Sequence, residues 1–403
     1  MKKIIAKSAA LIASASILAS TIMPVFADTA TNDTTGADSV NTTNVTNTND
    51  VTVTNVSDAF ISNRVTTTSN TGGNMASRNT MGGMVQTGDA VTDVAVLNSA
   101  NINTTMVDMG DGSSGNTAGN SITGALSGNW ANILNSNKVN VRNDNTAVIS
   151  NNVNATSNTG GNMANANTDG AGGMVQSGDA QTLVTLDTRA NDSATSVSGL
   201  GNHGSNVVGN SITGFNSDNT ANIRNLNDVR VNNVSDAAVW NTAIARSNSG
   251  GNMASRNTMG GMVQSGDALV DMGLLTDANI NTTSVDVAMG GFGSTSGNSI
   301  TGADSENWTN LLNRNVVRVN NINNKGQSQD APDYDECNPS SGDDKCDFHW
   351  GVMNFDHDVA NTGDNMANAN TLPSSVASGI AMVGKYIRVC LNDTLTSIGS
   401  LLP

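Results

Sequence analysis

The stretch from residue 43 to residue 71 alternates strictly between two kinds of position. The even positions are mostly Asn, Thr, Asp, Ser and Arg, and the odd positions come in pairs, two small or apolar residues and then two polar ones. Successive side chains of a β-strand point to opposite faces, so a period of two predicts strand. The odd positions are Thr43, Val45, Asn47, Asn49, Val51, Val53, Asn55, Ser57, Ala59, Ile61, Asn63, Val65, Thr67, Ser69 and Thr71.

This pattern recurs in four copies, which begin 88, 90 and 88 residues apart. Each copy opens with a Thr-Gly pair, at Thr35, Thr123, Thr213 and Thr301. A second recurring segment, rich in Gly and Asn, begins at Ser69, Ser157 and Ser247, and in a shortened form at Ala360. The odd positions keep their residue type from copy to copy while the even positions vary, so we assign the odd positions to the interior.

The amide residues of this constrained face are expected to form ladders. Inward amides that stack in successive coils can bond to one another along the stack. We expect the Asn residues to turn inward at corners of the coil, where they also bond the backbone of the next coil. The expected ladder residues are Asn47, Asn49, Asn135, Asn137, Asn225, Asn227, Asn313, Asn315, Gln86, Gln176 and Gln264.

These features predict an all-β fold, a parallel β-solenoid (β-helix) of about four 88-residue repeats. A straight strand over residues 43–71 would span on the order of 95 Å, so the run is expected to bend. The eight-residue apolar spacing then predicts three faces, a coil of roughly 22–24 residues and about four coils per repeat. Hairpins are disfavoured because the chain has no Asn-Gly pair. An antiparallel sandwich of repeats is the alternative fold.

Strand-like alternation is also expected after each recurring Gly-Asp-Ala. In the first copy it places one face at Val94, Val96, Asn98, Ala100, Ile102 and Thr104. In the third copy the equivalent positions are Met272, Leu274, Thr276, Ala278, Ile280 and Thr282.

The chain divides into five segments. The first has three lysines ahead of an apolar run that ends in small residues, which is typical of a secretory signal; an N-terminal membrane anchor is the alternative. The segments are a signal peptide (1–27), the solenoid repeats (28–325), an acidic, disulfide-bearing loop insertion (326–358), a last partial repeat (359–373) and a C-terminal cap (374–403).

Composition restricts the class of partner. The 403-residue chain has 18 Lys+Arg against 34 Asp+Glu, a net charge of -16, which argues against nucleic acid or anionic lipid as partner. Only 3% of residues are aromatic and 41 are Gly, which suits a thin solenoid of small residues better than a large globular core. No second apolar run of about 20 residues exists, so no transmembrane segment is expected in the mature chain.

Two cysteines and several acids lie in the late insertion. In an exported chain, Cys337 and Cys346 favour a disulfide over a metal site. Cys390, in the cap, is expected to be a buried thiol or to form another bridge. The acids could gather round Ca²⁺, although their spacing differs from that of an EF-hand and a solvated acidic loop is the alternative. The candidate calcium ligands are Asp330, Asp333, Asp335, Asp343 and Asp344.

No catalytic constellation stands out, and the remaining candidates have structural explanations. Three equally spaced acids, Asp89, Asp179 and Asp267, are interpreted as rungs of the repeat. Trp130 and Trp308 occupy an outward position, where they could stack on sugar rings or pack against a neighbouring turn. Pairs of thioethers suggest soft-metal sites, but filling of the core or of corners explains them better. These pairs are Met81 with Met84, and Met259 with Met262.

The Asn-x-Ala steps and the Gln-x-Gly steps somewhat resemble curlin repeats. The Asn-x-Ala steps begin at Asn74, Asn162, Asn252 and Asn365. Their order relative to Gln-x-Gly is reversed and a regular second Gln is missing. The resemblance covers residues 35–373 and implies Gln/Asn ladders and assembly into extracellular fibres. The chain is also similar to Asn/Gly-rich surface repeat proteins of bacteria.

We therefore expect a secreted or cell-surface structural or adhesive repeat protein, not an enzyme, that associates with copies of itself or with a cell-surface polymer. The alternative is a carbohydrate-binding or carbohydrate-cleaving β-solenoid. A third reading is a calcium-dependent adhesion module centred on residues 330–347; no other cofactor is expected.

Overall fold

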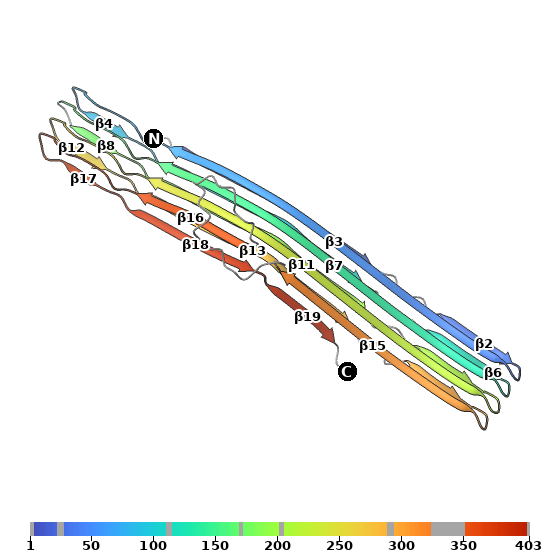
Figure 1. The fold of residues 1–403 in the computed structure, drawn as a ribbon. Coiled ribbons are helices and arrows are strands. Elements are labelled where there is room, and N and C mark those ends of the chain that lie inside the picture. The colour runs from blue at the N-terminus through green and yellow to red at the C-terminus, as the bar shows by residue number, and fades with distance from the viewer. Residues whose placement is uncertain are drawn as a thin grey trace, which may run out of the picture.

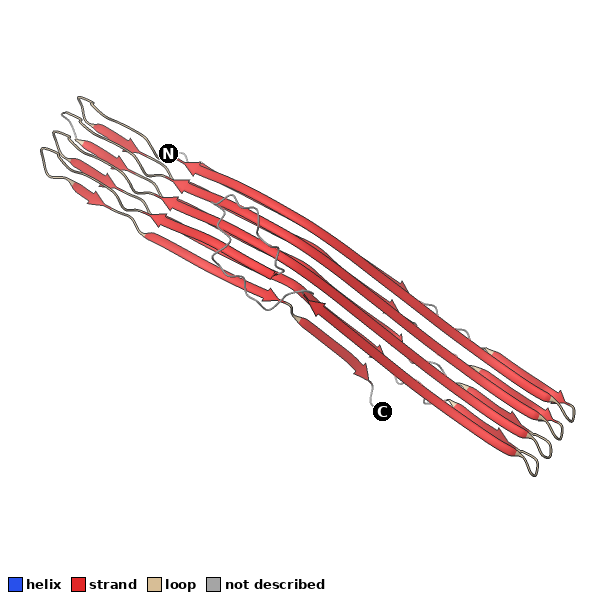
Figure 2. Ribbon diagram, in the orientation of Figure 1, coloured by secondary structure: helices blue, strands red, loops and turns tan. Residues whose placement is uncertain are grey.

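Parallel strands make up the regular structure of the described residues. The computed structural model describes the backbone of residues 4–21, and residues 28–109, 115–168, 172–200, 205–287, 294–323 and 351–400. The strands form four sheets, stacked in register as an elongated, gently twisted slab (Figures 1 and 2). The expected parallel β-solenoid is confirmed, and the antiparallel sandwich is wrong because each described strand pair is parallel.

One layer of the slab, called here the long layer, is a single sheet of very long strands. Three of them have 31 residues each. In the last coil the strand is divided into two parts that both pair with the strand before it. The strands are β3 (Val40–Asn70), β7 (Gly128–Asn158), β11 (Asp218–Asn248), β15 (Glu306–Asn323) and β16 (Gly351–Asn361).

The opposite layer, called here the segmented layer, consists of three shorter sheets. Its central sheet contains β1 (Ile4–Thr21), β5 (Ala90–Asp108), β9 (Ala180–Leu200), β13 (Ala268–Val287), β18 (Ala381–Leu391) and β19 (Thr394–Ser400). A sheet at one end contains β2 (Thr29–Thr35), β6 (Thr117–Thr123), β10 (Val207–Ser211) and β14 (Thr295–Ser299). A sheet at the other end contains β4 (Gly83–Gln86), β8 (Gly173–Gln176), β12 (Gly261–Gln264) and β17 (Ser375–Ala377).

One coil holds one complete repeat, so the expected coil of roughly 22–24 residues is wrong. Val53 pairs with Val141, which pairs with Val231, a whole repeat away each time. The long strands remain extended because an in-register neighbour satisfies their backbone, and they turn gradually by twisting (Figure 1). At about 3.3 Å per residue, β3 spans on the order of 100 Å.

The eight-residue apolar spacing marks compartments along one straight face rather than corners. Five clusters of small apolar side chains lie between the two layers. One of these clusters joins Val53 and Val141 of the long layer to Val107 and Val197 of the segmented layer. Rows of Asn separate the clusters, so the interior alternates between apolar and amide compartments along its length.

The segmented layer changes phase once in each coil. Ala100 and Asn101 are both buried, after which the inward positions are Asn103, Thr105 and Val107. The expectation that Ile102 and Thr104 share one face with Val94 is therefore wrong, and the same holds for Ile280 and Thr282 relative to Met272. The cause is a left-handed residue, Asn101 with φ of 54°, that rotates the chain by one position.

The Gly-rich and Thr-Gly segments form the turns at the two ends of the slab. At the Gly-rich end the backbones of successive coils nearly touch: a Cβ on Gly160 would lie 1.9 Å from the carbonyl oxygen of Gly250. At the Thr-Gly end a serine closes each turn. Its hydroxyl donates to the glycine carbonyl at 2.7 Å, from Ser39 to Gly36, from Ser127 to Gly124 and from Ser217 to Gly214.

The two ends of the chain take part in the stack. The backbone of residues 4–21, within the expected signal peptide, forms β1 along the outer edge of β5. The solenoid resumes at Gly351 rather than at residue 359, because β16 pairs with β11 from that residue onward. Strands β18 and β19, in the expected cap, continue the central sheet of the segmented layer.

Candidate functional site

The inward Asn residues of the long layer form hydrogen-bonded ladders from coil to coil. Each Nδ2 donates to the Oδ1 of the equivalent residue in the next coil. One ladder, with bonds of 3.1, 2.9 and 2.8 Å, joins Asn47, Asn135, Asn225 and Asn313. The other, with bonds of 2.9, 3.0 and 2.7 Å, joins Asn49, Asn137, Asn227 and Asn315. Both lie in the middle of straight strands, so their expected place at corners is wrong.

Three further interior ladders were not singled out from the sequence. They start at Asn41, Asn55 and Asn63. The third also bridges the layers, because Asn98 in the segmented layer donates to Asn151 at 2.9 Å. The sequence signal was present: these residues share the parity of Asn47, and each is repeated in the next copy.

A column of left-handed Asn residues ties the two layers together at the phase change. Asn191, with φ of 56°, donates to the backbone oxygen of Asp236 in the long layer at 2.7 Å. It also donates to Oδ1 of Asn279 in the next coil at 2.9 Å. Asn tolerates the left-handed region better than most residues, which explains its use here. The column is Asn101, Asn191, Asn279 and Asn392.

The repeated Gln and Asp residues are also engaged between coils. Gln86 donates from Nε2 to Oε1 of Gln176 at 3.0 Å, and Gln264 lies in register with Gln176. The carboxylate of Asp89 accepts the backbone N–H of Asp179 at 3.1 Å, and that of Asp179 accepts the N–H of Asp267 at 2.9 Å. These acids thus act as rungs that hold the backbone, and they do not converge on a cleft.

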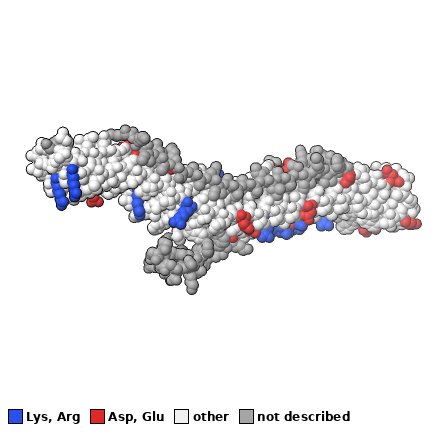
Figure 3. Space-filling model, turned by 90° about the horizontal axis from the view of Figure 1, so that it is seen from above, with Lys and Arg blue, Asp and Glu red and all other residues white. Residues whose placement is uncertain are grey.

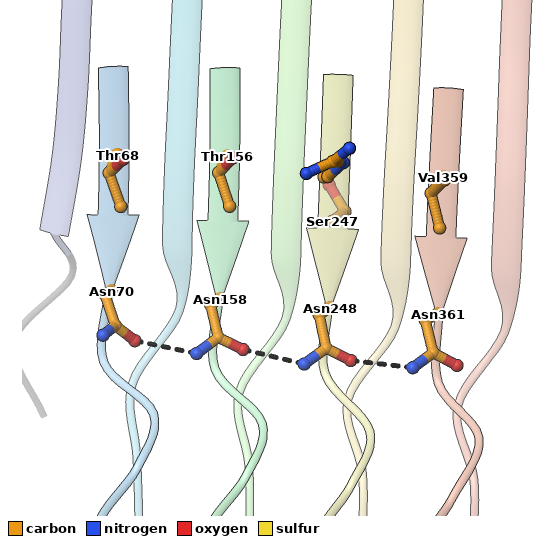
Figure 4. A pocket seen from close by; sticks show the side chains of 9 residues that line it. Thr68, Asn70, Thr156, Asn158, Ser247, Asn248, Val359 and Asn361 are labelled. Atoms are coloured by element: carbon orange, nitrogen blue, oxygen red, sulfur yellow. Dashed lines mark hydrogen bonds between the residues drawn. The ribbon is translucent and has the colours of Figure 1, made fainter. Parts of the chain in front are cut away.

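A shallow polar depression crosses the long layer near the Gly-rich turns (Figure 4). Its floor is an outer Asn ladder with bonds of 2.9, 2.9 and 3.1 Å that joins Asn70, Asn158, Asn248 and Asn361. Thr68, Thr156, Arg246, Ser247 and Val359 line the rest of it. The depression offers amides, hydroxyls and one guanidinium, but no acid–base pair.

The methionines of the Gly-rich segments lie outside the core, whereas Met109 and Met272 are buried in it. A column of bridges joins Met75, Met163, Met253 and Met366 at the Gly-rich turns. Met81 is 82% exposed, and Met84, Met259 and Met262 are exposed as well. The expectation that these methionines fill the core or corners is therefore wrong.

An apolar strip lies at the opposite, Thr-Gly end, and is called here the apolar tip. Ile122, Ile212 and Ile300 all have positive φ, between 49° and 53°, and all are exposed. A β-branched residue in the left-handed region is strained. Leu126 and Phe215 of the adjoining turns are exposed beside them in sequence. The strip was not predicted, because backbone handedness cannot be read from a strand-like pattern.

Trp130 and Trp308 lie on the outer face of the long layer. Thr42, Trp130, Thr220 and Trp308 occupy equivalent register positions in the four coils. The indole of Trp130 covers Gly128, on which a Cβ would lie 2.5 Å from the ring. Trp308 is 62% exposed.

The last coil carries charged side chains where the earlier coils have apolar ones. Asp356 and Lys385 form an ion pair at positions in register with the buried Ala243 and Met272. Asp358 is in register with the buried Ala245. Burial raises the pKa of the Asp358 carboxyl above its usual value, against the opposing charge of His357. Inward charges at an edge weaken further strand addition.

The expected disulfide and calcium site lie outside the described residues. This applies to Cys337, Cys346 and all the acids of the loop, from Asp330 to Asp344. Cys390, in β18, is a half-buried free thiol. In the part of the chain that the structure describes, no group of three or more His, Cys, Asp or Glu side chains could hold a metal ion.

Charge is sparse on the described surface. In the space-filling view, Lys, Arg, Asp and Glu are scattered over a largely uncharged face (Figure 3). No helix among the described residues is long and apolar enough to cross a bilayer. Comparison of the chain with protein-family models, curated proteins and solved structures finds no match.

Proposed function

We propose that the chain is a secreted or cell-surface structural repeat protein that associates with copies of itself or with a cell-surface polymer. The observation that carries the proposal is the use of the repeated polar residues. The inward Asn residues and the rung carboxylates are engaged in bonds between coils. Such residues build a rigid scaffold, because their polar groups are used in bonds along the stack.

The apolar tip and the exposed methionines support an adhesive role. Exposed apolar strips at repeated positions are typical of surfaces that meet another molecule. Because three of the four repeats add an Ile to one column and each repeat adds a Met to another, the stack multiplies a weak contact.

Electron microscopy of the processed protein, alone and on its source cells, tests this proposal. We expect immunogold label on the cell exterior and extended assemblies of the purified chain. A chain that remains monomeric at high concentration and depolymerises a glycan would contradict it.

Carbohydrate binding is the second candidate, and the polar depression favours it. Sugar hydroxyls could bond the amide row of Asn70, Asn158 and Asn248. Glycan-array binding that is lost in Thr156→Trp, which fills the depression, and retained in Asn140→Asp, on the outer face elsewhere, would support this role. Equal binding by the two variants would remove it.

A further inference from the structure

The central sheet of the segmented layer has two equivalent edges. Its strand order is β1-β5-β9-β13-β18, with β19 also paired to β13. Strand β1 covers β5 from Ala90 to Asp108, with a break between Ser99 and Ile102. Strands β18 and β19 cover the equivalent part of β13, from Ala268 to Val287, and break at the equivalent place, Asn392. Thus β1 lies where β18 and β19 of a preceding copy would lie.

The ladder bonds have a direction that suits head-to-tail stacking. Within the molecule, the bonds of the interior Asn ladder that starts at Asn47 all run from Nδ2 of one coil to Oδ1 of the next coil. Among the described residues, no hydrogen bond reaches Oδ1 of Asn47 or leaves Nδ2 of Asn313. The first coil therefore offers acceptors and the last coil offers donors. Two first coils placed together would oppose acceptor to acceptor.

The edge of the first coil is long and regular. In the long layer, β3 is the outermost strand over all its 31 residues. Its inward side chains include Val51, Val53 and Ile61, the same types that the later coils stack on. Long regular edges are ready templates for a further strand. The last coil matches this edge through β15, whose inward positions keep the repeat pattern.

We propose that the outer edge of the first coil, formed by β2, β3, β4 and β5, is the docking surface for the last coil of a second copy, and that residues 4–21 occupy its β5 part until they are removed. The inference rests on the self-association in the proposed function and names its surface. Removal of the segment frees the position that β18 and β19 of the second copy then take. The Asp356–Lys385 pair opposes this stacking, because the next coil must cover it.

A chain with a specific protease sequence in place of residues 22–27 tests the proposal. We expect the uncut chain to be monomeric by light scattering, and the cut chain to release the segment and form end-to-end stacks. A cut chain that remains monomeric overturns the proposal, whether or not the segment leaves. Equal assembly before and after cutting also overturns it, but leaves self-association, and with it the proposed function, intact.

Asn313→Asp tests the ladder contact in the same assay. The carboxylate still accepts the bond from Asn225 but has no donor for Asn47 of the next copy. We expect the concentration needed for assembly to rise about tenfold, as the loss of one such bond implies. Asn140→Asp, which adds the same charge on the outer face of β7, should leave assembly unchanged. Equal assembly concentrations for the two variants would contradict the proposal that Asn313 of one copy donates to Asn47 of the next.

The double variant Asp356→Ala with Lys385→Met restores the residue types of the third coil. It should lower the concentration needed for assembly of the cut chain by about tenfold or more, because a buried pair no longer has to be desolvated. Weaker assembly of this variant would show that the pair belongs to the contact instead of opposing it.

Discussion

At the scale of the residue, the solenoid depends on small polar side chains with two partners each. Asn191 is fully buried, left-handed, and bonded both across the layers and along the stack. An apolar residue of similar size could provide neither bond. The interior therefore needs few large side chains. Between the apolar clusters, rows of hydrogen-bonded amides hold the layers and the coils together.

Asn191→Ala should destabilise the fold strongly. It leaves the backbone oxygen of Asp236 without this donor and places Ala in the left-handed region. We expect a loss of about 2–4 kcal/mol in the free energy of unfolding by urea. Asn132→Ala, in an exposed outer ladder, should cost under about 1 kcal/mol. Similar losses for the two variants would show that the interior Asn column stabilises the fold no more than an exposed ladder does.

Ile212→Asn should stabilise the chain. The present Ile is exposed and has φ of 53°, a conformation that Asn adopts with less strain. We expect a gain of about 1 kcal/mol, read from the thermal midpoint, together with weaker adhesion because one member of the apolar tip is lost. A lower midpoint would mean that this isoleucine makes contacts that outweigh its strain.

Asp358→Ala should stabilise the last coil in a pH-dependent way. Burial raises the pKa of this carboxyl, so the folded state holds the proton more tightly than the unfolded state. The contribution of this carboxyl to the free energy of unfolding is therefore favourable at low pH, and it is lost as the pH rises through the raised pKa of the folded state. The variant should unfold at a higher temperature than the wild type at pH 7, with the difference shrinking towards pH 4. A difference that grows on acidification would contradict this.

At the scale of the element, turns set the spacing of the coils. The Gly-rich turns stack backbone on backbone, and the glycine column has no room for a side chain. The long strands then follow in register, since each begins and ends at equivalent turns.

Gly160→Ala tests the close approach at these turns. Its Cβ would lie 1.9 Å from the oxygen of Gly250, so adjacent coils must separate locally. We expect a loss of about 1–3 kcal/mol or more, measured by chemical denaturation with hydrogen exchange localised to the turn. Gly36→Ala is the matched control, because nothing lies within 4 Å of the added Cβ. Equal tolerance of the two changes would contradict the packing described.

The sequence predicted the faces of these elements better than their lengths. Period two placed Val51 and Asn47 inside, because parity follows directly from strand geometry. The pattern could not show where the chain turns, because an inward Asn has the same sequence pattern at a turn as in a ladder within a straight strand. The turns are at Gly36 and Gly72, in segments that do not follow the alternating pattern. The phase change at Asn101 was missed because one left-handed residue leaves no mark on an Ala-Asn-Ile run.

At the scale of the molecule, each repeat adds one flat coil, so the slab grows in thickness while its length stays constant. Four coils at about 4.8 Å each give a stack on the order of 20 Å, much shorter than the strands are long. Such a slab presents long ladder-filled edges at both ends of the stack. Stacking of copies would convert it into a fibre whose long strands lie across the fibre axis.

Small-angle X-ray scattering of the uncut chain, which retains residues 4–21 and is expected to be monomeric, tests the one-repeat coil most directly. We predict a flat particle with a maximum dimension above about 100 Å and a thickness on the order of 20 Å. A rod of roughly 60 Å, as coils of 22–24 residues would give, would contradict the account.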